Sequence, residues 1–127
     1  MRAQARRIAC LAGATAAGLL AMAAPAGSHD AGYDSRVTIH NPQPGVWHGR
    51  VFSERDSCEP DRLVKLMRPR PGPDEEVARD RTDADGRWDY IPIGERYYAR
   101  VVRKVIERPG HRHVCRADES RTIEGSY

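Results

Sequence analysis

Beyond its first 26 residues, the sequence has no long hydrophobic run, so we expect no membrane span after that point. It has no Gly-x-Ser-x-Gly elbow, no His-Glu-x-x-His pair and no Cys–His nucleophile pair free of an expected disulfide. No stretch shows sustained helical spacing, and nine prolines and eleven glycines interrupt the chain. These absences predict a β-rich protein that is not an enzyme and needs no cofactor.

The first 26 residues have the three parts of a secretory signal peptide. Residues 1–7 carry three arginines and no acid, residues 8–24 are uncharged, and Ala24-Pro25-Ala26 places small residues where a signal peptidase reads. A membrane anchor is the alternative, but the apolar run is rich in Ala and Gly and shorter than the roughly 20 strongly apolar residues that a bilayer needs. We predict cleavage after Ala26 and a secreted, extracellular protein. Arg6-Arg7 leaves the twin-arginine route open beside the general one.

The charge of the chain changes when this leader is removed. The sequence has 21 basic and 18 acidic residues, and three of the basic ones lie in the leader, so residues 27–127 are formally neutral. Nucleic-acid binding needs a surplus of Lys and Arg on one face. We therefore predict no nucleic-acid partner, and expect a monomer that binds a protein or a glycan.

The remaining segment is long enough for one domain, which we place at residues 36–127 after a flexible tail at residues 27–35. Leu, Ile and Val are sparse, so the hydrophobic core is expected to be small. Cys10 leaves with the leader, and Cys58 and Cys115 remain. An even pair of cysteines in an exported chain predicts a disulfide, which would stabilise the fold by about 4 kcal/mol.

Short β-prone runs alternate with turn signals, and their spacing near ten residues predicts a β-sandwich or barrel. Seven strands are expected, at residues 37–39, 46–53, 63–68, 77–82, 88–91, 96–106 and 113–123, with a bulge near residues 117–119. Alternation of side chains along each strand assigns the inward faces. The residues expected to face inward are Val51, Val64, Leu66, Trp88, Tyr90, Tyr97, Ala99 and Val101.

Five pieces of sequence follow one another in an order that resembles a known family. They are Gly49–Ser53 before Cys58, Arg62–Leu66, Thr82–Trp88, Tyr97–Val101 and the late Cys115. This order resembles the carboxypeptidase-regulatory-like, prealbumin-like (transthyretin-like) domains of exported bacterial proteins, over about residues 36–124. The resemblance implies a seven-stranded Greek-key β-sandwich with a structural, adhesive or accessory role and no shared catalytic residues. It also implies a bond between the loop after the second strand and the last strand, which matches Cys58 and Cys115.

Two motifs have the residue types of metal ligands. Asp83-x-Asp85-Gly86 could begin a calcium loop, but the later ligand positions lack suitable residues, so we expect a plain turn. His111-x-His113-x-Cys115 would place three zinc ligands on one face of a strand, but a disulfide would remove the thiolate of Cys115. No metal site is therefore predicted, although the histidine pair is left open.

Three aromatic residues, Trp47, Phe52 and Tyr98, are expected on the outward side or at strand ends, as a candidate patch for a sugar or a protein. The alternative is that Trp47 and Phe52 only cover the edge of the sandwich. The sequence thus predicts a secreted binding or structural module. Two other functions stay open: an inhibitor or effector that presents the loop Pro69–Asp74 to a protease or host protein, and a carbohydrate-binding module.

Overall fold

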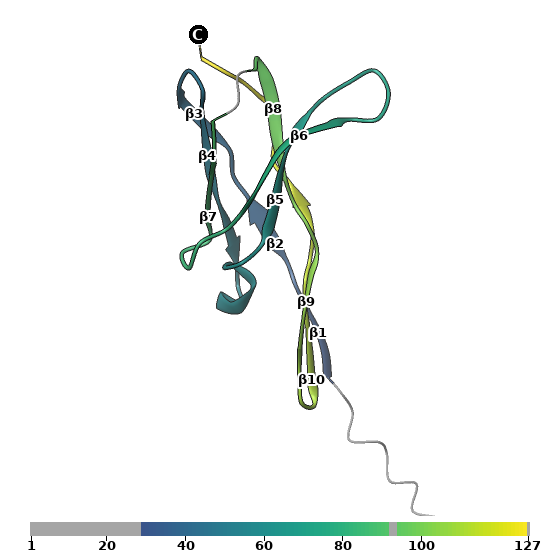
Figure 1. Cartoon of the computed structure of the whole chain (residues 1–127). Helices are drawn as coiled ribbons and strands as arrows, with labels where there is room; N and C mark the ends of the chain where they lie inside the picture. The colour runs from purple at the N-terminus through teal and green to yellow at the C-terminus, as the bar shows by residue number, and fades with distance from the viewer. Residues whose placement is uncertain (1–28, 92–93, 127) are drawn as a thin grey trace, which may run out of the picture.

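The structure, a computed structural model, describes residues 29–91 and 94–126 (Figure 1). The predicted signal peptide, residues 1–26, lies outside this part. The described residues form twelve strands and one 3-10 helix, η1 (Asp56–Cys58). None of their helices is long and apolar enough to cross a membrane. The all-β fold class predicted from the sequence is confirmed.

Two sheets pack face to face as a sandwich. In one sheet β8 (Arg96–Val101) pairs with β5 (Leu63–Arg68), and the flanking strands are β6 (Glu75–Arg81), β11 (Asp118–Glu119) and β12 (Ile123–Glu124). In the other, β4 (Val46–Ser53) pairs with β2 (Ser35–Val37), β3 (His40–Gln43) and β7 (Arg87–Tyr90). The chain crosses between the sheets from β4 to β5 and again from β6 to β7, as in Greek-key sandwiches.

A third sheet projects from one end of the sandwich (Figure 1). It consists of β1 (His29–Tyr33), β10 (His111–Cys115) and β9 (Lys104–Arg108), and we call it the arm. The strands β9 and β10 form a hairpin through Pro109-Gly110, and Gly110 has the positive φ of 76° that such a turn requires. The strand β1 runs parallel to β10.

The arm differs from the predicted flexible tail at residues 27–35. His29–Tyr33 is a strand because its backbone pairs with β10, about 80 residues later in the sequence. Such pairing leaves no local signal, because the partner strand supplies the hydrogen bonds.

Strand bounds match the prediction best where the chain is regular. β4 and β5 begin and end at the predicted residues. The predicted strand 96–106 is broken after Val101, where β8 leaves the sandwich and β9 joins the arm, and the predicted strand 113–123 is divided into β10, β11 and β12. Of the first predicted strand, 37–39, only Val37 lies in a strand, because β2 ends at Val37 and β3 begins at His40.

The core lies between the two sandwich sheets. All eight residues predicted to face inward are buried there. Val37, Ile39 and Trp47, from the β4 sheet and the segment between β2 and β3, complete this cluster. The small core predicted from the scarcity of aliphatic residues therefore contains four large aromatic rings, those of Trp47, Trp88, Tyr90 and Tyr97.

Candidate functional site

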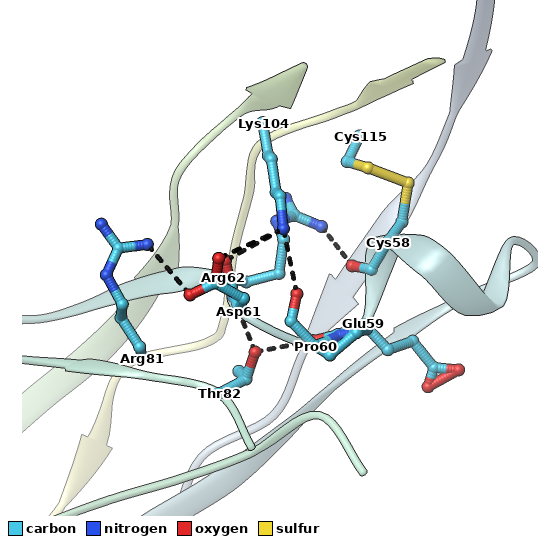
Figure 2. Close-up of polar contacts among 9 residues, drawn as sticks. All are labelled: Cys58, Glu59, Pro60, Asp61, Arg62, Arg81, Thr82, Lys104 and Cys115. Atoms are coloured by element: carbon cyan, nitrogen blue, oxygen red, sulfur yellow. Dashed lines mark hydrogen bonds and ion pairs between the residues drawn. A yellow bond between two sulfur atoms is a disulfide. The ribbon is translucent and has the colours of Figure 1, made fainter. Parts of the chain in front are cut away.

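The predicted disulfide is present where the arm leaves the sandwich. Cys58, at the end of η1, is bonded to Cys115, at the end of β10, with 5.4 Å between the two Cα atoms (Figure 2). Both residues are fully buried. The bond therefore fixes the arm to the loop that follows β4.

Beside this disulfide lies a buried arginine. Arg62 is fully buried, and its guanidinium donates hydrogen bonds to four oxygens: the carbonyls of Cys58 at 2.6 Å, Val102 at 3.0 Å and Arg116 at 3.0 Å, and the hydroxyl of Ser35 at 2.9 Å. All four acceptors are neutral. Since none of these acceptors offsets the effect of burial with a negative charge, burial lowers the pKa of Arg62 to about 10. The side chain stays protonated at neutral pH. The guanidinium thus connects β2, η1, the β8–β9 connection and the end of β10.

The same region is held from its outer side by the short loop before β5. Asp61 has a positive φ of 51°, which aspartate tolerates better than most residues. Lys104 of the arm donates to the carbonyls of Pro60 at 3.4 Å and Asp61 at 3.3 Å (Figure 2). The Thr82 hydroxyl donates to the Glu59 carbonyl and accepts from the Arg62 backbone N–H. The base of the arm is therefore tied by a covalent bond and by several polar contacts.

The predicted aromatic patch is not assembled at the surface. Trp47 is 1% exposed and packs edge-to-face on Tyr97 in the core. Phe52 is half-buried on the outer face of β4, between the guanidinium groups of Arg36 and Arg50 at 4.9 and 4.8 Å. Alternation along β4 explains the difference, since Trp47, Gly49 and Val51 share the inward face while Phe52 lies on the other.

Tyr98 is also buried, at 5% exposure, although it belongs to the outward set of β8. Its hydroxyl donates to the Asp74 carboxylate at 2.5 Å. This contact lowers the pKa of Asp74. Burial, followed by the same hydrogen bond, raises the pKa of Tyr98 to about 12. Tyr98 therefore anchors the β5–β6 loop, and the three predicted patch residues do not share a surface.

The two candidate metal motifs have other roles. The Asp83 carboxylate accepts the backbone N–H groups of Asp85 and Arg87, both at 2.9 Å, as in a turn. Cys115 is bonded to Cys58, so it offers no thiolate beside His111 and His113, whose rings lie 6.3 Å apart. Across residues 29–91 and 94–126, no group of three or more His, Cys, Asp or Glu side chains is arranged to hold a metal ion.

A cleft lies between the arm and the loop that contains η1. Its volume is about 370 Å³, and its lining includes Arg55, Ser57, Arg108 and His113, with the acids Glu54 and Asp56. Arg55 stacks over the Tyr33 ring at 5.6 Å, and His113 meets the same ring edge-to-face at 5.5 Å. We call it the arm cleft.

The arm cleft was not predicted from the sequence. One local signal points to it: residues 103–116 contain five basic residues, two histidines and a single acid. The neutral balance of residues 27–127 hides this concentration, because acids elsewhere offset it. Arg55 is distant in sequence and reaches the arm only through the fold.

The fold and the Cys58–Cys115 bond define the class of protein as a disulfide-bonded β-sandwich with a projecting three-stranded arm. No family model, no curated protein and no solved structure matches the chain.

Proposed function

We propose that the protein is exported and acts outside the cytoplasm as a non-enzymatic binding module, in which the sandwich is a rigid support and the arm meets the partner. The observation that carries this proposal is the tie at the base of the arm, where the Cys58–Cys115 disulfide and the buried Arg62 lie side by side (Figure 2). A disulfide of this kind persists in oxidising compartments. A preordered arm loses less conformational entropy on binding than a mobile hairpin.

We further propose that the sandwich is of the carboxypeptidase-regulatory-like, prealbumin-like kind. Two features support this proposal: the crossing connections between its sheets, and a disulfide from the loop after β4 to the end of β10. Members of that family serve as structural, adhesive or accessory modules, which agrees with a binding role.

The export proposal is tested by expressing the full chain in a bacterial host and recovering it from the periplasm or medium. Intact mass should show loss of residues 1–26 and a gain of two hydrogens on reduction. The variant Ala26→Arg is the matched control, because a charged residue beside the cleavage site should keep the leader attached. Retention of residues 1–26 in the unsubstituted protein, or two free thiols in exported material, would contradict the proposal.

The disulfide is tested by unfolding. The double variant Cys58→Ala/Cys115→Ala should lose about 4 kcal/mol of unfolding free energy, as expected for a loop of 57 residues. Reduction should destabilise the unsubstituted protein similarly and leave the double variant unchanged. Equal stability of the oxidised protein and the variant would show that the disulfide does not stabilise the fold.

A second candidate function is an inhibitor or effector that presents the loop Pro69–Asp74. One observation favours it: the loop is braced by the Tyr98–Asp74 hydrogen bond and by the ion pair of Arg70 with Glu75, and it extends from the sandwich (Figure 1). An inhibitor should bind one target tightly and lose that binding when Tyr98→Phe releases the loop. A binding module of the first kind should keep its partner in this variant.

A further inference from the structure

The arm cleft gathers hydrogen-bond donors from segments far apart in the sequence. Arg55 comes from the loop before η1, Arg108 from the end of β9 and His113 from β10. Ser57 adds a buried hydroxyl oxygen that has no hydrogen-bond partner within the described part of the chain. Backbone pairing of the arm and the Cys58–Cys115 bond hold these groups around one volume.

The lining of the arm cleft holds two arginines, two acids and one histidine. Neither Arg55 nor Arg108 forms an ion pair within residues 29–91 and 94–126, although Glu54 and Asp56 line the same volume. Burial, followed by the positive charges of Arg55, His111 and Arg108, lowers the pKa of His113. Arg55 and Arg108 therefore place positive charge near this imidazole, and an incoming anion would offset it.

Two guanidinium groups beside an imidazole and a hydroxyl suit an oxyanion, because guanidinium groups donate in a planar fork that matches sulfate, phosphate and carboxylate. The positive charge also extends beyond the cleft. Arg103 directly precedes β9, and Arg112 lies on β10 on the face opposite His113. Neither forms an ion pair in the described residues. A ligand that repeats its negative charge would therefore gain contacts that a single ion cannot make.

We propose that the arm cleft binds an acidic polysaccharide, with one sulfate or carboxylate group held by Arg55 and Arg108 and further groups along the hairpin. This inference rests on the proposed function, since it names the partner of the arm. A single-stranded nucleic acid fits less well, because its bases stack on exposed aromatic rings. On the described arm the aromatic ring other than histidine is Tyr33, and Arg55 and His113 already pack on it.

The test is calorimetric titration of the purified, oxidised protein with a sulfated heparin hexasaccharide, at low and at physiological salt. A neutral oligosaccharide of equal length should not bind. The double variant Arg55→Gln/Arg108→Gln should weaken binding by about tenfold or more, as expected for lost charge-assisted hydrogen bonds. Both side chains are exposed, so the fold should be kept, with only a small fall in melting temperature from the lost contact of Arg55 with Tyr33.

The matched control is Arg96→Gln/Arg121→Gln, which removes the same charge from exposed positions on the sandwich. It should bind within about twofold of the unsubstituted protein, as expected for screened, distant charges. An equal loss in both double variants would overturn the site, because it would show that net charge alone governs binding. Tighter binding of a single-stranded oligonucleotide would overturn the ligand class.

Inorganic sulfate and inorganic phosphate serve as separate probes of the source of the anion. If either ion binds as tightly as the hexasaccharide, the proposal of a polysaccharide ligand is overturned, and the arm cleft is a site for free ions. The protein used is exported material with residues 1–26 removed and the disulfide formed. If none of the probes binds to it, this inference is overturned while the proposed function stands.

Discussion

Arg62 donates a hydrogen bond of 2.6 Å to the carbonyl oxygen of Cys58, so a fully buried guanidinium is fixed to a residue of the disulfide. The two ties act on the same point by different means. The disulfide limits the freedom of the unfolded chain, whereas Arg62 satisfies backbone carbonyls that are buried where three connections meet.

Replacing Arg62 should therefore destabilise the protein strongly. Arg62→Met leaves buried oxygens without donors, and we expect the free energy of unfolding to fall by about 3 kcal/mol. Arg81→Met is the matched control, since its ion pair with Asp61 is exposed and should contribute less than about 1 kcal/mol. Urea unfolding measures both, and equal midpoints for the two variants would contradict the role assigned to Arg62.

Trp47 and Phe52 provide a test of which face of β4 is buried. Trp47→Ala should cost about 3–5 kcal/mol, because it empties a large volume in the core. Phe52→Ala removes a half-buried ring between two guanidinium groups and should cost only about 1 kcal/mol. Thermal unfolding followed by near-ultraviolet circular dichroism distinguishes them. A Trp47→Ala variant as stable as the unsubstituted protein would contradict the burial of Trp47 and support the predicted surface patch.

Gly49 lies where β4 approaches the segment between β2 and β3. A Cβ atom at this position would lie 1.9 Å from the backbone carbonyl oxygen of Thr38 and 2.7 Å from the Trp88 ring. Gly49→Ala should therefore force the two strands apart and lower the melting temperature by several degrees or prevent folding. Gly72→Ala is the control, as no atom lies within 4 Å of its added Cβ. Equal melting temperatures for the two variants would refute the close approach.

The lowered pKa of His113 makes stability depend on pH. As the pH falls through about 6.5, the unfolded chain takes up a proton at this histidine before the folded chain does, so the folded state loses stability. His113→Gln should reduce that loss between about pH 7 and pH 5.

The groups that face His113 are Tyr33, Arg55, Arg108 and His111, with Glu54 and Asp56 across the arm cleft. The measurement is urea unfolding at a series of pH values. An identical pH dependence in the unsubstituted protein and His113→Gln would show that this histidine does not contribute.

Much of the sandwich could be predicted because its signals are local. Alternation along β5, β7 and β8 identified the buried face, and Asp83-x-Asp85-Gly86 identified a turn. The same alternation places Trp47 inside, because Trp47 and Val51 are four residues apart in β4 and Val51 is predicted to face inward. Phe52 and Tyr98 were harder, because their burial depends on Arg36, Arg50 and Asp74, which belong to other segments.

The sequence alone determined the all-β character, the inward residues of the regular strands and the cysteine pair, because each depends on neighbours in the chain or on composition. The strand at His29–Tyr33, the burial of Arg62 and the approach of Arg55 to Arg108 and His113 arise from the folded chain. These depend on contacts between residues distant in sequence, and a side chain acquires its burial and charged neighbours only when the chain has closed around it.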